Sequence, residues 1–437
     1  MLTLLKFRAL NVTDKFLFSL TSILLLILTT LLLLRKVEYF FVDDWAIFND
    51  FSTSRHGLNL TNLAPYNGHS LIVTRILFIF ITATIGIQIS TFSIILTISL
   101  LGTVFFLARS ASRGFMTCNK NFAFFTIVIV CLNLNQYQNL TMPICWSWTI
   151  CLIAIIWTYL LTNQDLNIYR GTLLLILSVI GPLTLSFGFI IPGFLILKLA
   201  HEIYLGKRRR GNFILLTCIT FFTLFVFKIA ILNSTSEYGS FTNPSIIFKR
   251  PINSIIFLLT SIGSPFTPAS RFSVMIASVF GLVIFLLLFK IVQNAKSLSN
   301  FFVKDGFISL GIIFHMIHLL GRYDGSWTSI LISSQPRYST GAILLVLGIF
   351  LNLIRSATRN IQLVLVILLA TMTLSGAKTA GDFSTERHKE SVQISNCISN
   401  HTLTSSQCEQ FLFPGERILT QAKFRKAIIY LESVSAY

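Results

Sequence analysis

Apolar segments long enough to cross a lipid bilayer follow one another along most of this chain. The first occupies about residues 16–34, and only 11% of all residues are charged, against about 25% in a typical soluble domain. A bilayer core about 30 Å thick requires about 20 apolar residues per helix, and backbone groups in lipid must be hydrogen-bonded within the protein. The chain is therefore predicted to be an all-α polytopic membrane protein. Residues 16–34 lack a small-residue cleavage site, so they are expected to remain as the first span rather than act as a signal peptide.

Basic residues in short loops account for the net charge of +18. Lys6, Arg8 and Lys15 flank the start of the first span, and Lys207–Arg210 is the strongest cationic run. Cytoplasmic loops of membrane proteins carry an excess of Lys and Arg. The pattern predicts a cytoplasmic N-terminus and an outside C-terminus, and nucleic acid is not expected as a partner.

Eleven spans are predicted from hydropathy and from the sides of the basic loops. They are residues 16–34, 91–108, 122–135, 144–161, 171–184, 189–205, 213–232, 272–292, 306–320, 339–354 and 361–376. A broken apolar piece at 253–262 is not counted as a span.

The apolar stretch 70–86 admits two interpretations. If it crosses the bilayer, the loop with Arg109, Arg113 and Lys120 falls outside, against the positive-inside tendency. If it is re-entrant or lies on the surface, those cations fall inside. A re-entrant segment is allowed where protein buries its backbone ends, and the second interpretation is the prediction.

The chain is expected to divide into two parts. Residues 1–376 form the membrane domain, with 35–69 as its first outer loop, and the polar tail 377–437 forms a small outside domain of short helices. Cys397 and Cys408 lie in this tail and would form a disulfide in an oxidising compartment.

An acidic motif follows the first span. Asp43 and Asp44 stand beside Trp45, and ionisable groups at the membrane mark functional sites. A carboxylate can act as general base toward a hydroxyl, and the arginine fork binds phosphate. The predicted outer loops bring further polar residues to the same face, namely His69, Arg75, Gln136, Asn139, Arg322, Asp324, Arg337 and Tyr338.

The residues alone leave other roles open. Asp43 and Asp44 could cap and solvate the loop, or Asp44 could pair with Arg75 or Arg337. His315 and His318, three apart on one predicted helix, could be ligands or proton carriers, or core histidines. The acidic residues show no metal-ligand spacing, so no metal is predicted.

Several short motifs, in order along most of the chain, resemble those of the GT-C superfamily of membrane glycosyltransferases. The resemblance is to the bacterial and phage serotype-converting O-antigen glucosyltransferases. The motifs are Phe41-Val42-Asp43-Asp44-Trp45, Ala64-Pro65-Tyr66-Asn67-Gly68-His69-Ser70 with Thr74-Arg75, Asn135-Gln136-Tyr137-Gln138-Asn139, Ser186-Phe187-Gly188, Gly321-Arg322 and Pro336-Arg337-Tyr338-Ser339. The acidic motif is the most specific of them.

The resemblance implies a GT-C-like bundle with re-entrant helices and a site that opens to the periplasm at a bacterial inner membrane. It implies inverting transfer of a sugar, expected to be glucose, from polyprenyl phosphate to a lipid-linked polysaccharide such as O-antigen, with no separate cofactor. Asp44 would be the base, with Asp43 as second candidate, and Arg337, supported by Arg322, would stabilise the departing phosphate. The remaining implied roles are pocket walls from Trp45 and Tyr338 and hydrogen bonds to the sugar from His69 and Asn139.

Two other functions stay open at this point. A transferase of the same fold could modify lipid A or teichoic acid. A transporter or flippase of lipid-linked oligosaccharide is the alternative from a different class. A transporter would place charges along its spans, whereas the predicted spans here hold few.

Overall fold

The fold is described from a computed structural model of the chain. The described residues are 12–35, 70–85, 89–142, 145–206, 210–228, 245–268, 272–295, 305–355 and 358–399. Every regular element within these ranges is a helix. Several predicted features lie outside the described residues, namely Asp43, Asp44, Trp45, His69, Cys408 and the side chain of Cys397.

Among the described residues, six helices are long and apolar enough to cross a bilayer, as expected of a polytopic membrane protein. They are α2 (Val12–Leu34), α5 (Ile89–Ser112), α10 (Ile190–Tyr204) with the turn before it, α11 (Arg210–Phe227), α14 (Ser273–Gln293) and α19 (Arg359–Ser399). The number of eleven spans stays a prediction, because helix length and composition single out six.

Shorter helices complete the bundle. Those of 13–17 residues are α6 (Thr117–Cys131), α8 (Trp146–Thr162), α9 (Ile168–Thr184), α13 (Pro251–Gly263), α16 (Gly306–Arg322) and α18 (Ser339–Arg355). The 14-residue α4 spans Ile72–Ile85. Three short α-helices are α7 (Tyr137–Thr141), α12 (Ser245–Lys249) and α17 (Trp327–Ser333), and four 3-10 turns are η2 (Leu134–Gln136), η4 (Ser186–Phe189), η6 (Ser264–Phe266) and η7 (Pro336–Tyr338).

Side-chain caps explain where some of these helices begin. The Asn167 side chain accepts the N–H of Arg170 at 2.9 Å at the start of α9. Ser326 does the same for the N–H of Ser329 at 3.1 Å before α17. Each cap satisfies a backbone donor that the first turn of a helix leaves unpaired.

One end of the bundle collects basic residues and is called the basic end below. The Asn121 amide at the start of α6 donates to Asp14 of α2 at 3.2 Å. Asn119 donates to the carbonyl of Ile354, at the end of α18, at 2.9 Å. Arg355 pairs with Asp305, just before α16, at 2.8 Å. The starts of α2, α6 and α16 and the end of α18 therefore meet here.

The opposite ends of the same helices meet around the turns η2 and η7, and this region is called the turn end. The Tyr137 hydroxyl donates to the carbonyl of Leu31, near the end of α2, at 3.3 Å. Asn139 donates to Thr340, at the start of α18, at 2.6 Å. The rings of Phe92 in α5 and Trp146 in α8 lie 3.9 Å apart. The basic loops and the polar outer loops, which the sequence predicts on opposite sides, thus correspond to these two ends of the bundle.

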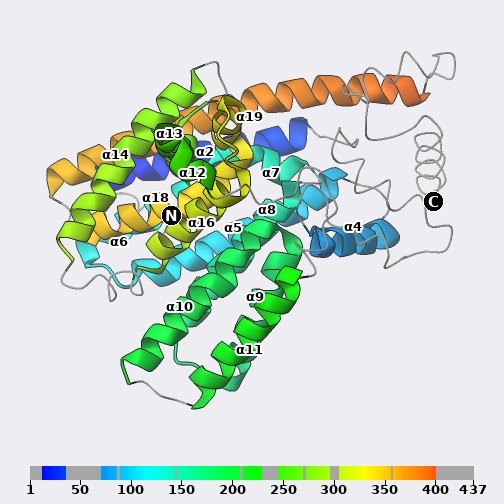
Figure 1. Cartoon of the computed structure of the whole chain (residues 1–437). Coiled ribbons are helices and arrows are strands. Elements are labelled where there is room, and N and C mark those ends of the chain that lie inside the picture. The colour runs from blue at the N-terminus through cyan, green and yellow to red at the C-terminus, as the bar shows by residue number, and fades with distance from the viewer. Residues whose placement is uncertain are drawn as a thin grey trace, which may run out of the picture.

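The helix α4 begins and ends on one side of the bundle. Ser70, just before it, donates to the carbonyl of Leu183 at the end of α9 at 2.5 Å. Four residues after Ile85, α5 starts at Ile89 with Phe92 against Trp146 at the turn end. Figure 1 shows α4 beside the bundle rather than within it. This arrangement agrees with the prediction that 70–86 does not cross to the basic side.

The helix α13 also keeps both of its flanks near the turn end. The carbonyl of Arg250, before the helix, accepts the Tyr323 hydroxyl at 3.2 Å just after α16. The carbonyl of Pro265, after it, accepts the Asn133 and Asn135 amides at 3.0 and 2.7 Å beside η2. The sequence analysis predicted the apolar piece 253–262 here and did not count it as a membrane span.

The last helix differs from the prediction. The expected span 361–376 and the first part of the expected tail domain form one continuous helix, α19, of 41 residues. Such a helix is about 60 Å long, twice a bilayer core. Figure 1 shows its C-terminal half, in orange, extending past α5, α6 and α18. The boundary at 376/377 marks where hydropathy changes, while no proline or cap ends the helix there.

The extension of α19 is held to the turn end by Arg35. Its guanidinium donates to the carbonyl of Gly381 and to the Ser384 hydroxyl, each at 3.1 Å, and also contacts Thr385. The ring of Phe383 lies 6.3 Å from that of Tyr137. The polar half of the helix therefore lies over the turn end and not over the basic end.

Close packing of α16 against α18 yields a testable stability effect. A Cβ at Gly311 would lie 2.5 Å from the Cβ and the backbone nitrogen of Leu345. Gly311→Ala is expected to destabilise the protein by about 1–3 kcal/mol, because the helices must move apart. The midpoint of thermal unfolding in detergent measures the effect. Gly102→Ala is the matched control, since nothing lies within 4 Å of its added Cβ, and equal midpoints for both variants would contradict the packing.

Candidate functional site

The turn end brings together two of the predicted motifs that are far apart in sequence. Asn139 in α7 donates its amide to the carbonyl of Arg337 at 3.0 Å and to the Thr340 hydroxyl at 2.6 Å. Its own carbonyl accepts the Thr149 hydroxyl at 2.9 Å. Asn139 is fully buried, so it positions the turn η7 from within. The residue predicted to bind a sugar holds the arginine turn in place.

Gln136 and its neighbours have a similar supporting place. The Gln136 amide donates to the carbonyl of Cys131, the last residue of α6, at 3.0 Å, and Gln136 is buried. Asn133 and Asn135 share the carbonyl of Pro265. These amides satisfy backbone carbonyls where the chain leaves helical structure, which a buried turn requires. Gln136, which was predicted as a substrate contact, bonds to the last residue of α6.

Aromatic rings surround Tyr338 on the inner side of this turn. The ring of Trp148 lies 5.3 Å away in a T-shaped arrangement, and that of His318 stacks at 4.5 Å. Phe187 of η4 lies 5.0 Å from Trp148, and Phe314 lies 5.1 Å from Phe187. Tyr338 is itself 4% exposed. The predicted wall residue is therefore the centre of a rigid aromatic cluster.

Arg322 and Arg337 keep partial exposure, whereas the polar side chains beneath them are buried. The guanidinium carbon of Arg337 lies 5.3 Å from the centre of the Tyr338 ring. Arg322 is the last residue of α16, the helix that carries His318, and His318 stacks on Tyr338 next to Arg337, so the two cations lie at the same end of the bundle. Two arginines near each other on a rigid support can bind a dianionic phosphate through paired hydrogen bonds.

Below the arginines, two histidines meet one serine. The Ser261 hydroxyl lies 3.0 Å from Nδ1 of His315 and 3.0 Å from Nδ1 of His318. Both histidines are buried, and neither Nε2 has a hydrogen-bond partner among the described residues. The sequence left open whether they are ligands or core residues. Their shared serine and the stack on Tyr338 place them under the site as its support.

Arg75 reaches the same end of the bundle by another route. It is 5% exposed and belongs to α4, whose preceding Ser70 is bonded to the end of α9. The turn η4 follows that end directly, and its Phe187 contacts Trp148. Leu71, between Ser70 and Arg75, has a φ of +46°, a conformation that costs a non-glycine residue roughly 1–2 kcal/mol. Such strain is frequent beside functional sites.

The loop acid Asp324 has a local role. Its carboxylate accepts the N–H of Ser326 at 2.8 Å. Burial raises the pKa of Asp324, but hydrogen bonds from Ser326 and Ser329 outweigh it and hold the pKa below its usual value. Asp324 is thus a carboxylate that shapes the turn with Gly325, whose φ is +83°. Within the described part of the chain, no three His, Cys, Asp or Glu side chains gather as a metal site.

Several members of this region escaped the sequence analysis. Trp148, Ser261 and Thr340 were not identified as site residues, because serine and threonine are common in spans and tryptophan is common at membrane interfaces. Phe187 stood in a recognised motif without an assigned role. The three-residue spacing of His315 and His318 did indicate one helix face, which the structure confirms by their shared contact with Ser261.

The bonds of Asn139 predict a stability difference between neighbouring amides. Asn139→Ala leaves the Arg337 carbonyl and the Thr340 hydroxyl without this donor and is expected to cost about 1–3 kcal/mol. Gln138→Ala is the matched control, since Gln138 bonds only to the sulfur of Met142 one turn away, at 3.2 Å. Thermal unfolding in detergent compares them. If Gln138→Ala lowers the midpoint as much as Asn139→Ala does, the proposed support of η7 is wrong.

Comparison with known proteins adds no relative to this description: no protein-family model, no curated protein and no solved structure matches the chain.

Proposed function

We propose that this protein is an integral-membrane glycosyltransferase that moves a sugar from polyprenyl phosphate to a lipid-linked polysaccharide. The observation that carries the proposal is the position of Arg337. Its turn is held by Asn139 at 3.0 Å, its guanidinium lies over Tyr338, and Arg322 ends the helix whose His318 stacks on Tyr338. A half-exposed arginine pair on a buried, hydrogen-bonded support is suited to a phosphate that becomes more negative during reaction.

The described residues on either side of the acidic motif are bonded at the turn end. Arg35 precedes it and is bonded to α19, and Ser70 follows it and is bonded to Leu183. A chain extends at most about 3.5 Å per residue, which keeps Asp43 and Asp44 within about 30 Å of Arg35. The proposal therefore combines a carboxylate and an arginine pair from opposite halves of the sequence at one membrane surface.

In the proposed reaction, Asp44 accepts the proton of an acceptor hydroxyl. The hydroxyl oxygen attacks the anomeric carbon of the donor sugar from the face opposite the phosphate. The new glycosidic C–O bond forms as the bond from the anomeric carbon to the phosphate oxygen breaks, so the configuration inverts. The electron pair leaves with polyprenyl phosphate, whose added negative charge Arg337 and Arg322 stabilise.

The partners follow from the same chemistry. The donor is polyprenyl-phosphate glucose, and the acceptor is a periplasmic lipid-linked polysaccharide of the O-antigen kind. The turn end then faces the periplasm and the basic end the cytoplasm of a bacterial inner membrane, in line with the excess of Lys and Arg in cytoplasmic loops. The polar extension of α19 lies on the acceptor side.

Reconstitution tests the proposal. Full-length protein in proteoliposomes is supplied with polyprenyl phosphate carrying labelled glucose and with a lipid-linked polysaccharide acceptor. The expected result is covalent transfer of label to the polysaccharide. Label that crosses the bilayer without transfer would favour a flippase instead. Comparison of surface polysaccharide from cells with and without the protein identifies the sugar and its linkage.

A further inference from the structure

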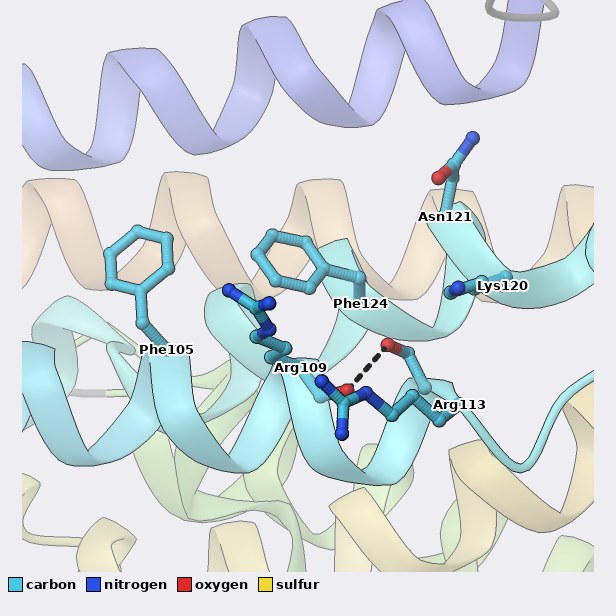
Figure 2. Close-up of a pocket in the computed structure, with 7 residues that line it drawn as sticks. Phe105, Arg109, Arg113, Lys120, Asn121 and Phe124 are labelled. Atoms are coloured by element: carbon cyan, nitrogen blue, oxygen red, sulfur yellow. Dashed lines mark hydrogen bonds between the residues drawn. The ribbon is translucent and has the colours of Figure 1, made fainter.

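We propose that the basic end carries a second site, separate from the transferase site, which binds the phosphate headgroup of an anionic membrane lipid. The site is a cavity of about 490 Å³ in the groove between α5 and α6. Its cations are Arg109, Arg113 and Lys120, and its rings are Phe105 and Phe124. Figure 2 shows Arg109 between the two rings, with Arg113 and Lys120 farther along the groove.

The charge of the groove is one-sided. Three exposed cations line it, and no acid does. Among the described residues, none of the three cations forms an ion pair or a side-chain hydrogen bond with the protein. The carboxylate of Asp14 in α2 lies beside the groove, where it accepts from the groove residue Asn121 at 3.2 Å, and Asp14 is 4% exposed. The charged side chains that line the groove itself are all positive.

The second half of the argument is the apolar wall. The rings of Phe105 and Phe124 lie 6.0 Å apart, and Phe105 is 39% exposed. The wall joins Phe105 of the membrane-length α5 to Phe124 of α6. Arg109 stands in the last turn of α5, Arg113 just after it, and Lys120 in the first turn of α6. Cations at the membrane surface above exposed rings match an amphiphile, with phosphate at the arginines and acyl chains along the phenylalanines. A soluble phosphate compound would leave the rings unused.

A second cavity, near the end of α18, lacks this pattern. It measures about 390 Å³, and a single cation, Lys290, lines it beside amides and aliphatic side chains. If the cations only reflected a general excess of positive charge at this end, both cavities would carry a similar number of them. The clustering of three cations over two rings distinguishes the groove between α5 and α6.

Lipid binding to the full-length protein in neutral detergent tests the site, with native mass spectrometry to count bound lipids. The probes are phosphatidylglycerol and phosphatidylcholine with the same acyl chains. Phosphatidylglycerol is expected to bind at least tenfold more tightly, because each Lys or Arg near an anionic headgroup contributes about fivefold. Arg109→Gln with Arg113→Gln is expected to weaken phosphatidylglycerol about 25-fold and to leave phosphatidylcholine unchanged.

Two comparisons keep the test decisive. Arg210→Gln removes an exposed cation of the basic end outside the groove and is expected to leave binding unchanged. Lys120→Gln, an exposed single change, is expected to weaken it about fivefold if the double variant does not fold. Equal binding of the two lipids, or equal binding by wild type and the groove variants, would overturn the proposal. Displacement by inorganic phosphate at the lipid concentration would assign the groove to a soluble phosphate instead.

Discussion

Replacement of Asp44 by Asn is expected to reduce sugar transfer by about 100- to 10,000-fold, the range that a positioned general base contributes. Asparagine has nearly the shape of aspartate but cannot accept the acceptor proton at neutral pH. The initial rate of label transfer in proteoliposomes measures the effect. Because the change affects chemistry more than packing, the unfolding midpoint of the variant is expected to match that of the wild type.

Neighbouring acids supply the controls for this experiment. Asp43→Asn separates the two candidates, and Asp50→Asn changes an acid of the same segment outside the motif. The expected order of rates is wild type and Asp50→Asn together, then Asp43→Asn, then Asp44→Asn. If Asp43→Asn is the slowest, the base is Asp43. Full activity of a correctly inserted Asp44→Asn protein, with Asp43 intact, would remove Asp44 from the mechanism.

The second large effect is expected at Arg337. Arg337→Gln removes the cation that we propose stabilises the departing phosphate, and it is expected to slow transfer about 100- to 1,000-fold. Arg337→Lys keeps the charge but loses the planar fork, so its rate should lie between those of wild type and Arg337→Gln. The carbonyl of Arg337 that Asn139 holds remains in both variants, which keeps the turn in place. The transfer rate at saturating donor reports this step.

Arg322→Gln and Arg210→Gln are the comparison variants for this prediction. Arg322→Gln is expected to have a smaller effect than Arg337→Gln, since Arg322 supports the same phosphate from the end of α16. Arg210→Gln lies at the basic end and is expected to transfer sugar at the wild-type rate. An Arg337→Gln rate equal to that of Arg210→Gln would show that the phosphate is stabilised elsewhere.

Much of the helix layout could be predicted because hydropathy is a local property. The predicted span 91–108 lies inside Ile89–Ser112, and 339–354 matches Ser339–Arg355. The prediction that 70–86 does not cross the bilayer agrees with α4, which begins and ends near the turn end. Where prediction was wrong, at the end of 361–376, the cause is that a hydropathy change does not terminate a helix. Only a cap, a glycine geometry or a proline does.

The site was only partly accessible to the same reasoning. The sequence identified Asn139, Arg337 and Tyr338 as polar residues of one membrane face. It could not assign Asn139 to the support of Arg337, because the two are 198 positions apart and side-chain pairing depends on how α7 meets η7. Nor could the sequence show that Arg75 is buried while Arg337 is half-exposed, since both arginines follow apolar or turn residues.

The sequence by itself determined the class of this protein, the positions of most helices and the separation of basic from polar loops. These depend on transfer of single residues between water and lipid, which each segment decides alone. The tertiary structure decided which polar residues support and which remain open to a ligand, how far α19 extends, and where three cations meet two rings. These depend on distances between distant segments, which only packing sets. The acidic motif Asp43-Asp44 stays a prediction of the sequence, and the flanking residues Arg35 and Ser70 are bonded at the turn end.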